Sequence, residues 1–281
     1  MMHDMSDSKT TTTSKPGAGL AARRLNFKVM HESGFFALPN PWDVGSVRRL
    51  ESLGFLALAS TSAGYAWSLG VDDRELSLEQ VIQHLGQLCE ATNLPVNADF
   101  ENGYADLPEE VADNVLRAAA TGVAGLSIED LANDGVGQDD LYELPLAVER
   151  LAAARQALDS VDPNIVLVGR SEGKLIGHHN LDDTIERLVA YAAAGADCLY
   201  APGFSDQETI AEIVAAVAPK AVNVLYRSDK MTSASLAALG VRRASTGSLL
   251  AKAAWRGFDE AAAKLAGAGS LPEALFGVTP T

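Results

Sequence analysis

The stretch PVNADFENGYADLPEEVADNVLRAAATGVAGLSIED, residues 95–130, contains the pattern that decides the fold. Short apolar runs at residues 95–100 and 124–130 flank a segment rich in Ala and Glu, which begins at Pro108 and ends at Gly122. Apolar runs of this length favour buried strands, and a segment bounded by these two residue types favours a helix. Because two parallel strands need a crossover between them, the stretch predicts a strand–helix–strand unit.

The same alternation recurs along most of the chain. Helical patterns separate further apolar runs at residues 35–40, 55–61, 164–170, 197–203, 221–226 and 242–247. About eight such units in roughly 250 residues predict an α/β fold, a (β/α)8 TIM barrel. A doubly wound sheet is the alternative, but it requires a Gly-rich phosphate turn after the first strand, and LPNPWD at residues 38–43 contains no glycine.

The segment before the first strand has two parts. The amphipathic LAARRLNFKVMHES, residues 20–33, predicts an extra helix ahead of the barrel. Residues 1–19 are polar and rich in Thr and Ser, without an apolar core, and they predict a disordered arm rather than a secretion signal. No internal linker interrupts the rest, so residues 20–281 are predicted to form a single barrel domain.

The composition narrows the classes of function. The net charge of −15 comes from 37 acidic and 22 basic residues, which argues against nucleic acid as a partner. No apolar run approaches the length that spans a bilayer, so no membrane partner is expected. The two cysteines, Cys89 and Cys198, are far apart and in no metal-binding spacing, which fits a reducing compartment and predicts a cytoplasmic protein.

Polar residues at the ends of the predicted strands are the first candidates for an active site, because barrel active sites lie at the C-terminal ends of the strands. Side chains alternate along a strand, so Asn97 and Asp99 share the face that points into the barrel. The same alternation turns Glu129 inward from the next strand and Arg170 from the strand after it. Asn223 occupies a comparable position in AVNVLY, residues 221–226.

Carboxylates from neighbouring strands suit Mg²⁺, which prefers oxygen ligands and keeps several waters beside one or two carboxylates. The remaining positions can accept a chelating 2-oxo acid, whose developing enolate the metal stabilises as a Lewis acid. Arg170 is expected to add a second positive partner for an anionic substrate. Glu172 shares its face and is either an acid/base group or a structural partner of this arginine. The competing interpretation of the acids and Arg170 is a plain buried ion pair.

Motifs spread over about residues 26–266 resemble those of the isocitrate lyase/phosphoenolpyruvate mutase superfamily. They are TSAGYAWSLGVDD (61–73), VNADFENGYAD (96–106), GLSIED (125–130), VGRSEG (168–173), LYAPG (199–203), VNVL (222–225) and GVRRASTG (240–247). The resemblance implies a barrel that binds Mg²⁺, with Mn²⁺ as an alternative, and forms a homodimer or homotetramer whose last helix is often exchanged between subunits. It also implies cleavage or formation of C–C or P–C bonds in 2-oxo or 2-hydroxy acids through a pyruvate-enolate-like intermediate.

The resemblance further implies roles for individual residues. Asp99 resembles the direct metal carboxylate, and Glu129 resembles the acid that binds the metal through water. Asn97 stands where many members have a second Asp that holds a metal water. Asp73 resembles an acid near the metal and the substrate, and Arg170 resembles the arginine that contacts the substrate oxygens.

Substrate binding is expected from two further segments. In SAGY, residues 62–65, Ser62 begins a turn that resembles the loop whose backbone amides, here of Gly64 and Tyr65, hold the substrate carboxylate. Asn223 lies at a strand-end position that often lines the pocket in the superfamily.

The loop after the fourth strand departs from the superfamily pattern. Lyases carry there a Lys-Lys-Cys-Gly-His-type sequence with a catalytic Cys, and the phosphonate enzymes carry a Lys and an Asn. In this chain LANDGVGQDDLYELP, residues 131–145, contains Asn133 but no Cys, Lys or His. Together with the insertion FEN at residues 100–102, this loop indicates a divergent subgroup without the catalytic Cys.

Other polar residues are predicted to have structural roles. Glu101 is predicted to lie in a solvated loop. His178 and His179 are predicted to lie in a polar loop, with an acid/base role over the mouth as the alternative. Arg242 and Arg243 are predicted to form an exposed basic pair, with a phosphate site as the alternative.

These observations predict a Mg²⁺-dependent lyase that cleaves a C–C bond of a small 2-oxo or 2-hydroxy dicarboxylate, for example as an oxaloacetate decarboxylase or a methylisocitrate lyase does. Its catalytic residues are predicted to be Arg170, Asp73 and Glu172. One alternative is phosphonopyruvate hydrolase or mutase chemistry on a C–P bond. The other is a barrel that binds a 2-oxo acid without turnover.

Overall fold

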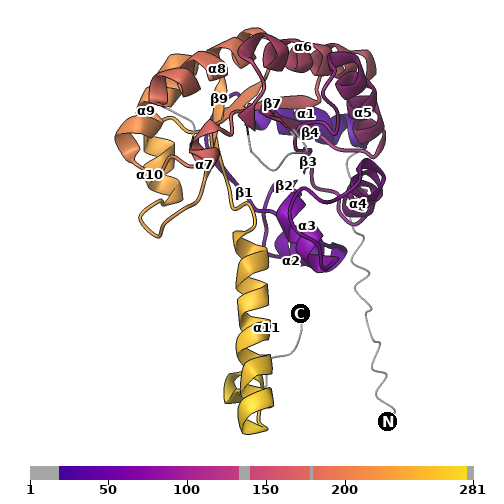
Figure 1. Ribbon diagram of the computed structural model, residues 1–281, viewed down its shortest axis with the longest axis vertical. Helices are drawn as coiled ribbons and strands as arrows, with labels where there is room; N and C mark the ends of the chain where they lie inside the picture. Colours follow the sequence, from indigo (N-terminus) through magenta and orange to yellow (C-terminus); the bar gives the residue numbers. More distant parts are fainter. Residues whose placement is uncertain (1–18, 133–139, 178–179, 277–281) are drawn as a thin grey trace, which may run out of the picture.

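The computed structural model describes residues 19–132, 140–177 and 180–276. Eight parallel strands form one sheet in the order β1-β10-β9-β8-β7-β4-β3-β2, and helices surround it (Figure 1). The strands are β1 (Phe36–Leu38), β2 (Leu58–Ala59), β3 (Val96–Asp99), β4 (Gly125–Glu129), β7 (Val166–Arg170), β8 (Cys198–Tyr200), β9 (Ala221–Leu225) and β10 (Arg243–Ser245). Each strand lies within one of the apolar runs identified in the sequence, and the TIM-barrel prediction is confirmed.

The barrel closes between β1 and β2 through contacts at the C-terminal ends of the two strands. The amide of Ala59 donates to the carbonyl of Pro39 at 3.0 Å, and Asn40 Nδ2 donates to the carbonyl of Ser60 at 2.7 Å. Asn40 Oδ1 also accepts from the amide of Gly247, after β10, at 2.9 Å. The side chain of Asn40 therefore joins three of the segments that follow the strands.

Helices connect the strands and precede and follow the barrel. They are α1 (Leu20–Met30), α2 (Val44–Ser52), α3 (Ser62–Ser68), α4 (Leu78–Glu90), α5 (Pro108–Ala120), α6 (Leu144–Val161), α7 (Gly173–Ile176), α8 (Leu181–Ala193), α9 (Gln207–Val217), α10 (Ser233–Ala238), α11 (Leu249–Ala268) and the 3₁₀ turn η1 (Glu273–Leu275). Capping boxes at Asp43, Ser77 and Thr232 begin α2, α4 and α10, because each side chain accepts a hydrogen bond from an otherwise unpaired amide of the first turn. A short antiparallel ribbon of β5 (Leu131–Ala132) and β6 (Asp140–Leu141) follows β4.

The apolar core has two layers, as expected for a barrel wrapped by helices. The alternating residues of β3 illustrate this arrangement: Val96 and Ala98 pack in the layer between strands and helices, whereas Asn97 points into the barrel. Helix α1 closes the end of the barrel that lies opposite the C-termini of the strands. Its Phe27 is fully buried among the inward residues of the strands, and Arg24 donates to the carbonyl of Ala119 at 2.8 Å. The prediction of an extra helix in residues 20–33 is confirmed by α1, which ends at Met30.

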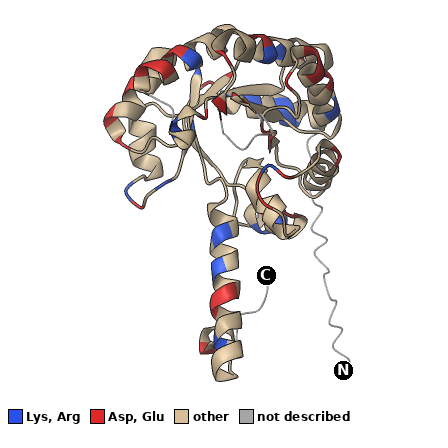
Figure 2. Cartoon of the chain, in the orientation of Figure 1, with Lys and Arg blue, Asp and Glu red and all other residues tan. Residues whose placement is uncertain are grey.

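Helix α11 extends away from the barrel (Figure 1) and exposes apolar side chains. Trp255 is 37% exposed, Phe258 is 64% exposed and Leu265 is 50% exposed. Figure 2 shows basic and acidic bands along this helix, and further charged residues over the outer helices of the barrel. Exchange of the last helix between subunits stays a prediction.

Two predictions about the chain as a whole are not decided by the fold. The disordered arm, residues 1–19, lies outside the described residues except for Gly19, which precedes α1. The single domain over residues 20–281 also remains a prediction. Among the helices in the described ranges, none combines the length and the apolar character that crossing a membrane requires.

Candidate active site

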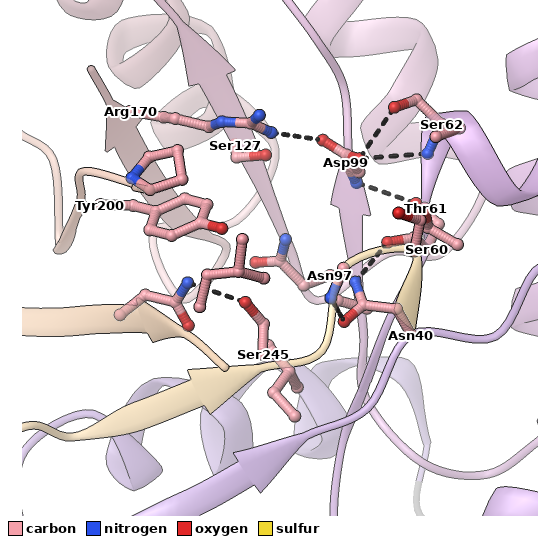
Figure 3. Close-up of a pocket in the computed structure, with 18 of the residues that line it drawn as sticks. Asn40, Ser60, Thr61, Ser62, Asn97, Asp99, Ser127, Arg170, Tyr200 and Ser245 are labelled. Carbon is pink, nitrogen blue, oxygen red and sulfur yellow. Dashed lines mark hydrogen bonds and ion pairs between the residues drawn. The ribbon is translucent and has the colours of Figure 1, made fainter. Parts of the chain in front are cut away.

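A cavity of about 200 Å³ opens at the C-terminal ends of the strands. Figure 3 shows Arg170 and Asp99 facing each other across it, with Ser62 beside Asp99 and Tyr200 near Arg170. The cavity brings together most of the residues predicted from the sequence: Ser62, Asp73, Asn97, Asp99, Arg170 and Asn223. This is the position at which barrel enzymes bind their substrates.

Arg170, the last residue of β7, is the centre of a cluster of acids at the mouth of the cavity. Its Nη1 lies 3.1 Å from Asp99 Oδ1 and 3.2 Å from Glu129 Oε2, and its Nε donates to Glu172 Oε1. The guanidinium carbon also lies 5.3 Å from the centroid of the Tyr200 ring. One cation therefore faces three carboxylates, which leaves negative charge in excess.

The pKa shifts of the acids reflect burial first and this excess of negative charge second. Burial raises the pKa of Glu129 and of Glu172, and neighbouring carboxylates add to the rise although Arg170 opposes it. Desolvation of its carboxyl and the charge of Asp99 raise the pKa of Asp73, although the residue as a whole is exposed, which weakens the shift. A further cation in the cluster would relieve the repulsion.

Hydrogen bonds with Ser60, Ser62 and Arg170 orient Asp99. The amide and the hydroxyl of Ser62 both donate to Asp99 Oδ2 at 3.1 Å, and the amide of Asp99 donates to Ser60 Oγ at 2.8 Å. Because the register pairs Asp99 with Ser127 of β4, a small side chain lies beside it and leaves room in the cavity. The carboxylate of Asp99 thus borders the cavity from a fixed direction.

These residues fit a divalent cation by charge and by donor type. Mg²⁺ accepts one or two carboxylates, and waters complete its shell. Asp99 and Asp73 both border the cavity and would supply these carboxylates. Within the described ranges, no three His, Cys, Asp or Glu side chains converge as a ready-made metal cage. Arg170 accounts for this, because its guanidinium lies between the carboxylates of Asp99, Glu129 and Glu172.

Glu129 and Glu172 lie deeper in the protein than the sequence indicates. Neither borders the cavity, and they are 6% and 4% exposed. Both contact Arg170, so the structural partnership predicted as one option for Glu172 is present. For Glu129 to hold a metal-bound water, its ion pair with Arg170 must therefore break.

Glu172 is held in turn by Asp130, a residue that was not among the predicted site residues. The amide of Glu172 donates to Asp130 Oδ1 at 2.8 Å. Asp130 Oδ2 accepts from the Tyr191 hydroxyl and from Arg187 Nη1, the latter at 3.3 Å. The position of Asp130 directly after Glu129 in GLSIED was the available signal for this supporting role.

The predicted carboxylate-binding amides are already engaged in α3. The amide of Gly64 donates to Thr61 Oγ1 at 3.2 Å, and that of Tyr65 donates to the carbonyl of Thr61 at 3.1 Å. The Tyr65 ring stacks on His84 with 3.6 Å between the ring centroids. The structure therefore does not present these two amides to a ligand. Ser62 borders the cavity, whereas Gly64 and Tyr65 do not line it.

Close packing accounts for the glycine of this turn. A Cβ at Gly64 would lie 2.7 Å from Thr61 Cγ2 and 3.1 Å from Trp42 Cβ. The requirement for glycine thus comes from the contact of α3 with its neighbours.

The prediction for Glu101 is wrong, because this residue is 6% exposed rather than solvated. Its backbone has a φ of +44°, and Tyr104, whose hydroxyl donates to Glu101 Oε1 at 2.9 Å, has a φ of +58°. Burial raises the pKa of Glu101 to about 7. The turn after β3 therefore places one more acid behind the cluster.

The prediction of an exposed basic pair at Arg242 and Arg243 is also wrong. Arg242 is half-buried and donates to the carbonyl of Gly34, whereas Arg243 is 2% exposed and borders the cavity from inside the barrel. Alternation along β10 was the signal that one of two adjacent arginines must point inward. His178, His179 and Asn133 lie outside the described residues.

Comparison with known proteins identifies the relatives of this chain. The family model described as phosphoenolpyruvate phosphomutase matches residues 27–266. An uncharacterized protein of Mycobacterium tuberculosis is 32% identical over 80% of this chain and 83% of its own length. An oxaloacetate decarboxylase of Rhodopseudomonas palustris is 34% identical, and the match covers 62% of this chain and 61% of the decarboxylase.

Solved structures share the whole fold. A candidate lyase/mutase from Burkholderia cenocepacia J2315 has a TM-score of 0.88 and 41% identity, and the match covers 92% of this chain and 93% of that one. A 2,3-dimethylmalate lyase, described as a member of the PEP mutase/isocitrate lyase superfamily, has a TM-score of 0.80 and 25% identity, with 94% and 91% covered. The resemblance stated from the motifs is thus confirmed.

Proposed function

The chain belongs to the phosphoenolpyruvate phosphomutase family, and we propose that it is a Mg²⁺-dependent lyase that breaks a C–C bond in a small 2-oxo or 2-hydroxy dicarboxylate. The observation that carries this proposal is the cavity at the strand ends, where Arg170 faces more carboxylates than it can neutralise. A divalent cation and an anionic substrate together complete such a site.

Decarboxylation of oxaloacetate is the reaction that this residue set serves best. In that reaction the bond to the departing carboxylate breaks, CO₂ leaves, and the electron pair forms the enolate of pyruvate, which then takes up a proton. Cleavage of a 2-hydroxy acid also needs a base to remove the hydroxyl proton. The loop at residues 131–145 contains no Cys, Lys or His that could act as this base. Decarboxylation of a 2-oxo acid does not require such a base.

Each residue of the mouth has a task in this scheme. Asp99 would hold the metal directly, with Asp73 and Glu129 acting through its waters. When bound, the metal supplies Lewis-acid stabilisation of the enolate. Arg170 contacts the substrate oxygens and is kept in place by Glu172. We assign to Asp73 the return of the proton, because its side chain borders the cavity, where it can reach a bound enolate.

The named relatives support the same class of reaction. The oxaloacetate decarboxylases match over about 61% of their own length, so their activity is a guide to this proposal and not a property read from the alignment. The dimethylmalate lyase is named for cleavage of a substituted malate, which is also a small dicarboxylate.

The assembly is proposed to be a homodimer or homotetramer in the cytoplasm. The exposed apolar side chains of α11, among them Trp255 and Phe258, support a subunit contact through this helix. Cys89 and Cys198 are buried and unpaired, which agrees with a reducing compartment. Light scattering after size-exclusion chromatography tests the assembly, and a monomer would contradict it.

A substrate panel tests the proposed activity. The protein is incubated with Mg²⁺ or Mn²⁺ and with oxaloacetate, methylisocitrate, an alkylmalate or phosphonopyruvate, and pyruvate release is measured against a protein-free control. Turnover of oxaloacetate above that control supports the proposal. Turnover of phosphonopyruvate alone would assign the site to C–P chemistry, and binding of the acids without any turnover would sink the lyase assignment.

A further inference from the structure

Arg243 is a buried cation whose neighbours within the described ranges include no carboxylate. It is 2% exposed, and its donors are Nε to Asn223 Oδ1 at 3.0 Å and Nη1 to Asn97 Oδ1 at 3.2 Å. Nη1 also lies 3.2 Å from His31 Nε2. Nη2 donates to no residue within these ranges, and the side chain borders the cavity.

The three neighbours of Arg243 are all neutral. His31 Nδ1 lies 2.7 Å from the carbonyl of Phe27, so this nitrogen carries the proton and Nε2 accepts from Arg243. The amide nitrogen of Asn223 donates to Ser245 Oγ at 3.0 Å, which fixes the orientation of its oxygen toward the guanidinium. The positive charge of Arg243 is therefore hydrogen-bonded but not compensated.

Other buried arginines of the described residues are satisfied differently. Arg24 lies 3.6 Å from Asp162. Arg150, at 1% exposed, donates to three backbone carbonyls, which belong to Asn102, Ala105 and Asp106, and it does not border the cavity at the strand ends. Burial of an uncompensated charge costs several kcal/mol. An arginine that has no negative partner and faces a cavity points to an anionic ligand as its missing partner.

The floor and the mouth of the cavity are separated by a distance that suits a small acid. Asn97, which contacts Arg243, and Asp99, which contacts Arg170, lie two residues apart on the same face of β3, and about 7 Å therefore separates them along the strand. A four-carbon dicarboxylate with one carboxylate at the floor thus extends toward Asp99 and Arg170 with its other end.

We propose that Arg243, together with the amides of Asn97 and Asn223, is a carboxylate-binding subsite at the floor of the cavity. This inference rests on the proposed function, and it assigns to the floor the carboxylate that the product keeps. The carboxylate that leaves as CO₂ then points away from Arg243, past the side of the cavity that Leu175 and Pro202 line. An ion pair to the departing carboxylate would stabilise the substrate and slow its loss, so the buried charge of Arg243 is better placed on the carboxylate that the product keeps.

The subsite also replaces the contact expected from the turn at residues 62–65. The amides of Gly64 and Tyr65 are used within α3, so the carboxylate that they were expected to hold needs another donor. Arg243 supplies charge-assisted hydrogen bonds for it, which are stronger than those of neutral amides.

The test compares ligands with and without the carboxylate in variants of the two adjacent arginines. Binding of pyruvate and of its uncharged amide, pyruvamide, is measured by calorimetry with Mg²⁺ present. Arg243→Met is expected to weaken pyruvate binding about tenfold or more and to leave pyruvamide unchanged, because a charge-assisted hydrogen bond is lost. Arg243→Lys keeps the charge but not the forked geometry, so its loss is expected to be smaller.

Arg242→Met is the matched control, because Arg242 is the neighbour in sequence, its side chain donates to the carbonyl of Gly34, and it does not border the cavity. It is expected to bind pyruvate as the natural protein does. Should Arg243→Met fail to fold, judged by its thermal melt, Arg243→Lys decides instead.

Three outcomes would overturn the subsite: pyruvate affinity unchanged in the Arg243 variants, equal loss of pyruvate and pyruvamide, or no pyruvate binding by the natural protein. Failure of the lyase proposal looks different. In that case pyruvate binds and depends on Arg243, but no acid of the substrate panel is turned over.

Discussion

The mouth and the floor of the cavity each contain one buried arginine, in opposite electrostatic surroundings. At the mouth, Arg170 contacts three carboxylates, and burial raises the pKa of nearby Glu101 to about 7. At the floor, Arg243 contacts two amides and an imidazole, and burial, together with the charge of Arg243, lowers the pKa of His31 to about 3. Negative charge is in excess at one end and positive charge at the other.

This contrast shows how one strand can serve a cation and an anion together. Asp99 at the end of β3 supplies charge to the mouth, and Asn97, two residues earlier, contributes none to the floor. An aspartate at position 97 would neutralise Arg243 and abolish the difference. A neutral side chain at position 97 therefore has a physical role of its own: it leaves the charge of Arg243 available to an anionic ligand.

The largest effect is expected at the mouth from Asp99→Ala. Removal of the direct metal carboxylate should weaken Mg²⁺ binding about a hundredfold or more. Calorimetric titration with Mg²⁺ measures this loss, and Asp113→Ala, an exposed acid on α5, is the control with unchanged affinity. Equal Mg²⁺ affinity in Asp99→Ala and the natural protein would remove Asp99 from the metal site.

A smaller effect on turnover is expected from Arg170→Met. Loss of a positive partner for the developing enolate should lower kcat by about a hundredfold. The variant also leaves Glu129 and Glu172 without their cation, so a thermal melt must accompany the kinetics. Arg117→Met, at the surface of α5, serves as control, and a kcat equal to the natural value would reject the role of Arg170.

Asn97→Asp tests the floor directly. The new carboxylate should pair with Arg243 and lower the affinity for pyruvate about tenfold. If position 97 instead acts as a metal ligand, the same variant should bind Mg²⁺ more tightly and leave pyruvate binding intact. Parallel titrations with Mg²⁺ and pyruvate separate these two roles.

The smallest effect concerns the pH dependence of stability and comes from His31. Because its folded pKa of about 3 lies below the ordinary value of 6.5, the unfolded chain binds the proton more tightly between these values. Its contribution is therefore complete above about pH 6.5 and is lost as the pH falls toward 3. His31→Phe should flatten this part of the stability curve, measured by urea unfolding in EDTA; an unchanged slope would contradict the assignment.

The fold and most of the residues that line the cavity can be predicted from the sequence for the same reason. Alternation with a period of two places Asn97 and Asp99 inward on β3, and it needs no knowledge of distant residues. Arg170 and Asn223 line the cavity by the same local rule. The strands themselves follow from short apolar runs separated by helical patterns, which is again a local signal.

The remaining features depend on contacts between segments that are distant in sequence. The burial of Glu101 depends on the turn that follows β3 and on the Tyr104 hydroxyl. The position of Glu129 at the end of its strand was predicted correctly. Its ion pair with Arg170, which keeps the carboxylate away from the cavity, was predicted only as the competing interpretation. For Arg243, alternation was sufficient to predict an inward side chain, but its lack of a carboxylate partner appears only when β9, β3 and α1 come together.

The most direct test of the central claim is release of pyruvate from oxaloacetate, followed in EDTA and after restoration of Mg²⁺. Metal ions alone promote this reaction, so Asp99→Ala at the same Mg²⁺ concentration provides the baseline. The site described here predicts turnover that EDTA abolishes, Mg²⁺ restores and Asp99→Ala lacks. Turnover that persists in EDTA, or a rate for Asp99→Ala equal to that of the natural protein, would contradict a metal-dependent lyase at the mouth of this cavity.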